Sequence, residues 1–186
     1  MNMKTKDLVL VSLFAALTAV MAQIAIPLPS GIPITLLVLA VFLSGAILGS
    51  KLGFLSQLVY ILLGAIGIPV FANFSGGIQV LAGITGGYIL SLPLACFIIG
   101  KLIEKYKGDN EKVKITIYTL SMLLGLLIIY SIGTLQFSIL TGNTIIKSLK
   151  LTVLPFIVAD LVKLAISVPL AYTVKNSLIK SKLLMT

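Results

Sequence analysis

The sequence lacks histidine and arginine, and it has one cysteine among its 186 residues. Without histidine, and with Cys96 alone, the chain cannot assemble the ligand clusters that usually bind transition metals. Cys96 also has no partner for an internal disulfide. We therefore expect no metal site and no cofactor.

Charged residues are scarce as well. They make up 10% of the chain, hydrophobic residues make up 59%, and the mean hydropathy is +1.18. A soluble domain is about a quarter charged and about half apolar. A chain with so little charge cannot cover a water-facing surface, so the composition excludes an ordinary soluble domain and predicts an integral membrane protein.

The apolar residues are gathered into six segments, each long enough to cross a hydrocarbon core about 30 Å thick. Prolines, glycines and charged residues separate these segments. We predict one all-α domain over residues 1–186, a bundle of six transmembrane helices. The predicted spans are Leu8–Ile26, Ile32–Leu48, Leu52–Ile68, Ile84–Ile103, Ile115–Phe137 and Leu151–Val174.

The lysines indicate how the bundle is oriented. If the N-terminus is cytoplasmic, the outside loops hold only Lys147 and Lys150, and Lys163 lies inside a span. The positive-inside rule then predicts a multi-pass protein of the cell membrane with both termini in the cytoplasm. The lysines on the inside are Lys4, Lys6, Lys51, Lys101, Lys105, Lys107, Lys112, Lys114, Lys175, Lys180 and Lys182.

The N-terminal segment allows a second interpretation. Lys4 and Lys6, followed by an apolar run that reaches Val20-Met21-Ala22, also fit a cleavable signal peptide. Cleavage would leave five spans that begin outside, which fits the lysine distribution too. The apolar run continues through Ile26, which favours a retained span.

Two ionisable residues stand inside the last predicted span. Asp160 and Lys163 are three residues apart, so a helix places them on one face. Ionisable groups inside a membrane cost about 2.5–3.5 kcal/mol each on insertion scales and usually mark function. The pair either neutralises itself and holds its helix in place, or it offers an acceptor and a cation to a small polar ligand; we favour the ligand site.

A glycine-rich stretch runs from Gly64, near the end of the third predicted span, to Tyr88, near the start of the fourth, and includes the loop between them. Glycines this dense allow the backbone to approach a ligand or to fold back into the bundle. Asn73 and Tyr88 supply hydrogen-bonding groups there, although the same pattern also fits a plain surface loop. The chain has no phosphate-binding GxxxxGK[ST] motif, so we expect no ATP hydrolysis by this chain.

The first predicted span carries small residues at helical spacing. Ala15 and Ala19 are four residues apart, and Ala22 extends the same face. Small side chains let a second helix approach closely in lipid. The face fits either packing within the bundle or docking of another subunit.

Taken together, these motifs resemble the BioY family, the biotin-specific substrate-binding (S) components of energy-coupling factor (ECF) transporters. The resemblance covers nearly the whole chain. It rests on four stretches, which are Pro33-Ile34-Thr35-Leu36, Ser56 to Tyr60 with Leu63 to Ala72, Gly83 to Tyr88, and Pro155-Phe156 with Asp160 and Lys163. The family often has Gln where this chain has Leu37 and Pro where it has Ile84, so we assign no polar contact at the start of the second span.

The resemblance implies a six-helix S component that binds biotin near the extracellular face. It also implies partners, namely a transmembrane coupling protein (the T component) and two ABC-type ATPases. The alanine face of the first span is where such proteins are expected to dock on the coupling protein, and the S component is thought to topple in the membrane to release its substrate inside.

Biotin fits the residues singled out above. Its ureido ring offers two N–H donors and one carbonyl acceptor, so we predict that Asp160 accepts from the ureido N–H groups. Lys163 donates to the ureido oxygen or keeps Asp160 ionised, and Asn73 and Tyr88 close the site. Gln57 is a weaker candidate, because it also fits a packing role.

Two other classes of function remain open at this point. One is an S component for another vitamin, such as thiamine or riboflavin. The other is an intramembrane enzyme or a channel, although the sequence shows neither a nucleophile–base set nor metal ligands, and we expect a transporter subunit that is not an enzyme.

Overall fold

The computed structural model describes residues 4–29, 31–181 and 183; Lys182 lies outside the described residues. The chain is mainly helical, with one short antiparallel strand pair. In chain order the elements are α1 (Thr5–Gln23), β1 (Ala25–Ile26), β2 (Ile34–Thr35), α2 (Leu37–Leu43), the π-helix η1 (Ser44–Leu48), α3 (Gly49–Ala65), the 3₁₀-helix η2 (Ala72–Phe74), α4 (Ile78–Ala82), α5 (Gly86–Leu90), α6 (Leu92–Lys105), α7 (Glu111–Thr141), α8 (Ile145–Thr152) and α9 (Ile157–Lys180).

Within the described residues, five helical stretches are long and apolar enough to cross a membrane. One of them, Leu37–Ala65, is bent back on itself at Gly49, whose φ of +83° an L side chain rarely adopts. The reversal lets Gln57 of α3 donate to Ser44 of η1 at 3.1 Å, although the two are 13 residues apart. The stretch is therefore a hairpin of two helices, in agreement with the predicted all-α bundle of six membrane segments.

The observed helices differ from the predicted spans at both ends of the bundle: α9 ends at Lys180 and not at Val174, and two helices begin later than predicted. The second span begins at Leu37 and not at Ile32, and the last begins at Ile157 and not at Leu151. Prolines explain both shifts, because Pro33 and Pro155 lack an amide hydrogen and disfavour helix in the residue before them. The helix α2–η1 is thus only about 18 Å long. The connections at this end of the bundle contain secondary structure that the sequence did not predict, namely the β1–β2 pair and the short helices α4 and α8.

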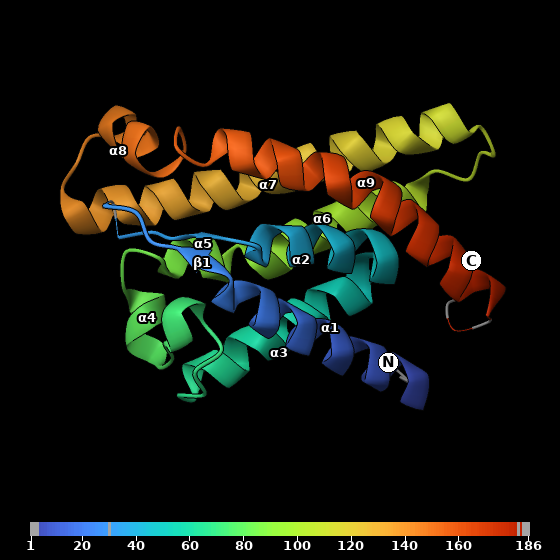
Figure 1. Ribbon diagram of the computed structural model, residues 1–186, viewed down its shortest axis with the longest axis horizontal. Coiled ribbons are helices and arrows are strands. Elements are labelled where there is room, and N and C mark those ends of the chain that lie inside the picture. Colours follow the sequence, from blue (N-terminus) through green and yellow to red (C-terminus); the bar gives the residue numbers. More distant parts are fainter. Residues whose placement is uncertain (1–3, 30, 182, 184–186) are drawn as a thin grey trace.

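Figure 1 shows how the two ends of the bundle differ. Both termini, the turn at Gly49 and the α6–α7 connection lie at one end, while α4, α8 and β1 lie at the other. Among the described lysines, those predicted to face the cytoplasm lie at the first end, which we call the lysine end. Lys147 and Lys150 of α8 lie at the opposite end.

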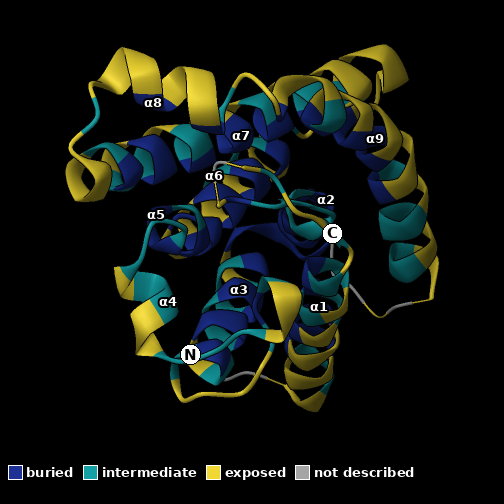
Figure 2. Cartoon of the chain, turned by 60° about the vertical axis from the view of Figure 1, so that its left-hand side comes forward, coloured by how far each residue is buried: buried dark blue, intermediate teal, exposed yellow. Residues whose placement is uncertain are grey.

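The outer helices carry apolar side chains on their surface. Leu13 of α1, Leu127 of α7 and Val162 of α9 are each more than half exposed, and many similar residues surround them. Figure 2 shows exposed faces turned outwards on α1, α7, α8 and α9. Apolar surface of this extent is stable only against lipid, which agrees with a membrane protein.

The alanine face of α1 is largely turned inwards. Ala15 and Ala22 are buried, in one apolar cluster with Val41 and Tyr60, and Ala19 packs against the same cluster. In this structure these three residues therefore contact the rest of the bundle, and docking of another subunit at this face stays a prediction. The small residues that α1 leaves exposed include Ser12 and the neighbouring Ala16.

Candidate functional site

A cavity of about 360 Å³ lies at the end of the bundle opposite the lysine end. It exists because α2 and α9 begin late at this end, so that loops and short helices surround a space that longer helices would fill. Residues from every α-helix from α2 to α9 and from the connections between them form its wall. Its size is within the range of about 300–1,000 Å³ that is usual for small-molecule sites.

The cavity's charged residues come from the first two turns of α9. Asp160 is 1% exposed and Lys163 is 6% exposed, and Lys163 Nζ donates to Asp160 Oδ1 at 2.6 Å. Tyr130 of α7 donates its hydroxyl to the other carboxylate oxygen, Oδ2, at 2.5 Å. Buried charges are stable only when they are paired and hydrogen-bonded, and here both oxygens of Asp160 have a donor.

This arrangement leaves hydrogen-bonding positions on Asp160 and Lys163 free for a ligand. An ionised carboxylate has about four acceptor positions and an ammonium has three donor hydrogens. Tyr130 and Lys163 occupy two of the positions on Asp160, and Asp160 takes one hydrogen of Lys163. Among the described lining residues, Asp160 and Lys163 are the charged ones, so the cavity presents a neutral pair with free acceptor and donor positions side by side.

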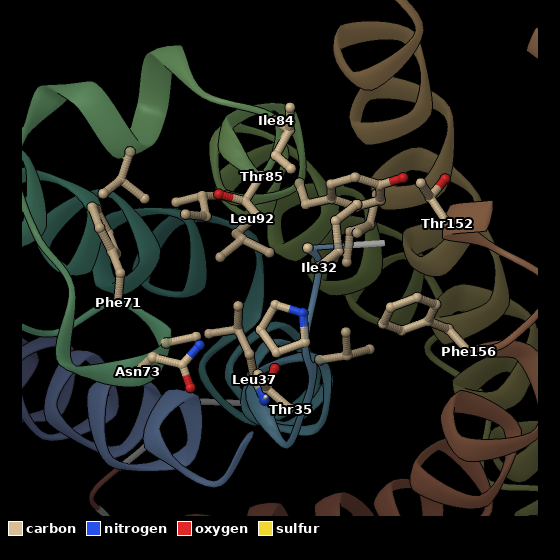
Figure 3. A pocket seen from close by; sticks show the side chains of 18 of the residues that line it. Ile32, Thr35, Leu37, Phe71, Asn73, Ile84, Thr85, Leu92, Thr152 and Phe156 are labelled. Atoms are coloured by element: carbon tan, nitrogen blue, oxygen red, sulfur yellow. Dashed lines mark hydrogen bonds between the residues drawn. The ribbon is translucent and has the colours of Figure 1, made fainter. Parts of the chain in front are cut away.

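Asn73 stands on the wall opposite α8 and α9. Figure 3 shows Phe71 and Asn73 on one side of the cavity, with Thr152 and Phe156 on the other. Asn73 has φ of 58° and ψ of 36°, the left-handed conformation that asparagine tolerates better than most residues. Within the described part of the chain, its side chain makes no hydrogen bond, so the amide remains available to a ligand.

The Asn73 loop is fastened to the bundle at two points. Phe71 is buried and packs edge-on against Tyr60 of α3, with ring centroids 5.5 Å apart. Gln23, the last residue of α1, donates to the carbonyls of Val70 and Phe71 at 3.1 Å each, and its oxygen accepts from the amide of Phe74 at 2.9 Å. Gln23 therefore holds the loop's backbone on both sides of Asn73.

Tyr88 of α5 also lines the cavity. Its hydroxyl is 3.2 Å from the hydroxyl of Thr134 on α7, which is in turn 3.4 Å from that of Thr152 on α8. The Thr152 hydroxyl donates to the carbonyl of Ser148. This chain of hydroxyls orients Tyr88 and joins three elements around the site.

Gln57 does not line the cavity. It is fully buried between α1, η1 and α3, where its amide donates to Thr18 at 3.0 Å and to Ser44 at 3.1 Å. Both hydroxyls donate to their own helices, to the carbonyls of Phe14 and Ala40. The structure thus places Gln57 in an inter-helix contact, apart from the other predicted site residues, Asp160, Lys163, Asn73 and Tyr88, which all line one cavity.

Comparison with known proteins matches residues 1–180 to the BioY family. The chain belongs to the BioY family. A relative from Pyrococcus horikoshii, described as a probable biotin transporter BioY, is 48% identical over 169 residues, which is 91% of this chain and 96% of the relative. The biotin transporter BioY of Thermotoga maritima is 42% identical over 171 residues, which is 92% of this chain and 96% of the relative.

A solved structure is also similar to this BioY-family chain. It is the crystal structure at 2.1 Å of the S-component for biotin from an ECF-type ABC transporter. The two folds superpose with a TM-score of 0.82 at 25% sequence identity, over 94% of this chain and 95% of the other. The membrane fold of this chain is therefore that of an ECF-type S component.

The sequence did not predict two residues that help to build the site in this BioY-family chain, Tyr130 and Gln23. Tyr130 is 30 residues from Asp160, and Gln23 is 47 residues from the nearer carbonyl that it binds. Both are polar residues within or at the end of an apolar helix, which is the one signal that the sequence offered. Among the described residues, no group of three or more His, Cys, Asp or Glu side chains could hold a metal ion.

Proposed function

We propose that this chain is the high-affinity biotin-binding S component of an ECF-type vitamin uptake transporter. The observation that carries the proposal is the buried pair of Asp160 and Lys163 on the wall of the cavity, in a chain whose relatives are described as biotin transporters. A paired acceptor and donor match the edge of a cyclic urea, which presents N–H and C=O groups next to one another.

In the proposed complex the ureido ring lies against α9. Asp160 accepts from a ureido N–H with a position left free by Lys163 and Tyr130, and Lys163 donates to the ureido oxygen. Asn73, from the opposite wall, offers a carbonyl and an NH₂ group to the remaining ureido edge. A ligand without these groups would leave buried polar atoms unpaired, so the site should discriminate strongly.

In the proposed complex, the thiophane ring of biotin contacts the apolar wall of the cavity and its valerate chain reaches solvent. Phe71, Phe156 and Ile32 line the cavity and suit the thiophane ring. The described lining residues offer the valerate carboxylate no cation besides Lys163. Because a buried carboxylate without a partner is costly, we propose that the valerate points to the opening of the cavity and stays hydrated.

Transport requires partners and an orientation. We propose that both termini are cytoplasmic in the cell membrane, so that the cavity opens outwards and the lysine end faces the cytoplasm; the gathering of the described lysines at one end supports this. The chain has no ATP-binding motif. Energy would come from a transmembrane coupling protein and two ABC-type ATPases, with release of biotin inside by toppling of the S component.

The test is calorimetry of the purified chain with a panel of vitamins and without ATP. We expect saturable binding of biotin and none of thiamine or riboflavin. Biotin amide, which keeps the ureido ring and lacks the anion, should bind within about fivefold of biotin, because the valerate stays hydrated. Absence of saturable biotin binding would overturn the proposal, and binding of another vitamin instead would assign the site to that ligand.

A further inference from the structure

A second hollow lies at the lysine end of the bundle, between the ends of α7 and α9. Its volume is about 560 Å³, and η1 and the α6–α7 connection form its other walls. Figure 1 shows α9 crossing α7 and diverging from it towards this end. The hollow therefore lies among the ends of the spans, at the end of the bundle where most of the described lysines gather.

The acidic residues in this hollow already have partners. Glu104 accepts from both the amide and the hydroxyl of Ser50, at 2.7 Å each, and so caps the start of α3. Asp109 pairs with Lys114 at 3.4 Å. Among the described lining residues, these are the only two acids. Asp109 is thus paired with a lysine, whereas the two donors that Glu104 binds are neutral groups of Ser50.

Two lysines of the hollow are left without a carboxylate. Within the described residues, neither Lys107 nor Lys175 has one within 4.0 Å. Lys175 is half-buried, and its Nζ donates to the carbonyl of Ala46 in η1 at 3.0 Å. An ammonium has three donor hydrogens, so two remain on Lys175. The described lining residues hold the three lysines Lys107, Lys114 and Lys175 against the two carboxylates of Glu104 and Asp109, so the hollow carries a net positive charge.

The walls beside these lysines are apolar and aromatic. Tyr118 and Tyr172 pack edge-on with ring centroids 6.1 Å apart, and Ile117 and Ile179 lie next to them. Tyrosine is favoured at the level of lipid headgroups. A ligand that fits both parts of the hollow has a negative headgroup and apolar chains.

We propose that this hollow binds a phosphate group, presented by an anionic phospholipid of the leaflet at the lysine end. The phosphate would lie between Lys107 and Lys175, with an acyl chain against Ile117 and Ile179 where α7 and α9 diverge. Basic pockets between transmembrane helices are suited to anionic headgroups, and each lysine near such a surface is worth about fivefold in affinity. This inference does not depend on what the first cavity binds. Free inorganic phosphate carries the same charged group, and the experiment separates the two sources.

The experiment measures lipid retention on the full chain in detergent by native mass spectrometry. The probes are palmitoyl-oleoyl phosphatidylglycerol, palmitoyl-oleoyl phosphatidylcholine and inorganic phosphate. Lys107→Gln with Lys175→Gln removes both charges, and glutamine at 175 keeps a donor for the Ala46 carbonyl. Lys101→Gln with Lys105→Gln is the matched control, because it removes the same charge from exposed lysines of the same end that do not line the hollow.

We expect one phosphatidylglycerol to be retained and phosphatidylcholine not. The hollow variant should bind phosphatidylglycerol about 30-fold more weakly, and the control should stay within about twofold of the parent chain. Equal retention by both variants, or equal loss from both, would overturn the proposal. If inorganic phosphate displaces the lipid at comparable concentration, the lipid assignment fails in favour of free phosphate.

Two further measurements keep the test decisive. Thermal unfolding in lipid-free detergent reports whether the double variant folds; if it does not, the exposed Lys107→Gln alone should weaken phosphatidylglycerol binding by about fivefold. A variant that retains the lipid but loses co-purification with a coupling protein would show that the hollow receives a protein, which would overturn the lipid proposal.

Discussion

The two ends of the bundle use charge in opposite ways. At the cavity end, one acid and one lysine are buried together on α9 and satisfy each other and a tyrosine. At the lysine end, exposed lysines outnumber acids and most have no partner among the described residues. Burial makes the difference, because an unpaired charge is costly inside the protein and cheap in contact with water and headgroups.

The comparison implies that a change of charge should strongly affect stability and biotin affinity at the cavity end and affect them little at the lysine end. Experiments can test this by changing one side chain at a time at the cavity end, with a control elsewhere in the molecule. The predictions below run from the largest expected effect to the smallest.

Breaking the buried pair should have the largest effect. Asp160→Asn or Lys163→Met leaves the other charge uncompensated, at about 3–5 kcal/mol. We expect biotin affinity, measured by calorimetry, to fall by two orders of magnitude or more for each. The double variant should recover thermal stability more than affinity, since it removes the stray charge and not the need for contacts. Near-normal affinity in the double variant would mean that the pair only holds α9 in place.

Removing the Tyr130 hydroxyl should have the next largest effect. Tyr130→Phe takes a donor from the Asp160 carboxylate, and a hydrogen bond to a charged group is worth about 1.5–3 kcal/mol. We expect biotin affinity to fall by about 10-fold to 100-fold. Tyr118→Phe is the control, because Tyr118 is also a tyrosine of α7 but lies at the lysine end. Equal affinity losses in the two variants would show that Tyr130 does not act through Asp160.

Enlarging the buried face of α1 tests packing, not binding. Ala15→Leu forces a larger side chain into a filled interior, at about 1–3 kcal/mol, and should lower the thermal midpoint. Ala16→Leu is the matched control, one residue further along the same helix on its exposed face. We expect it to leave the midpoint unchanged. If Ala15→Leu is as stable as the parent chain, the face of α1 that carries Ala15 is not packed as described.

Releasing the Asn73 loop should have the smallest effect. Gln23→Leu keeps the volume of the side chain and removes its bonds to the carbonyls of Val70 and Phe71 and to the amide of Phe74. We expect biotin to dissociate about 3-fold to 10-fold faster, in stopped-flow measurements, because Asn73 is less well positioned. Gln79→Leu is the control, since the one side-chain hydrogen bond of Gln79 among the described residues goes to the carbonyl of Gly76, within the same loop. An equal effect of both changes would argue against a positioning role for Gln23.

The sequence predicted some features of the site and missed others for a physical reason. Asp160 and Lys163 could be paired in advance because they are one helical turn apart, so local geometry alone brings them together. Asn73 and Tyr88 were selected by residue type within a glycine-rich loop, and both line the cavity. Tyr130 and Gln23 reach their partners across helix contacts, and residue spacing along the chain contains no information about such contacts.

The face of α1 shows the same limit. Apolar residues lie on all sides of helix α1, so no polar stripe marks which side contacts protein and which contacts lipid. In a soluble helix the hydrophobic effect separates the two faces, whereas lipid is as apolar as the interior. The sequence could therefore identify the small residues Ala15, Ala19 and Ala22 without deciding whether they pack inwards or dock a partner.

The sequence by itself determined the membrane class, the number of membrane segments and the ionisable pair on α9, because composition and spacing within one helix decide these properties. Only the tertiary structure decided where the cavity lies, which side chains complete it and which face of α1 is buried. Those features depend on where helices stop and how they pack, and close packing between apolar surfaces is set by the shapes of the side chains and not by their polarity.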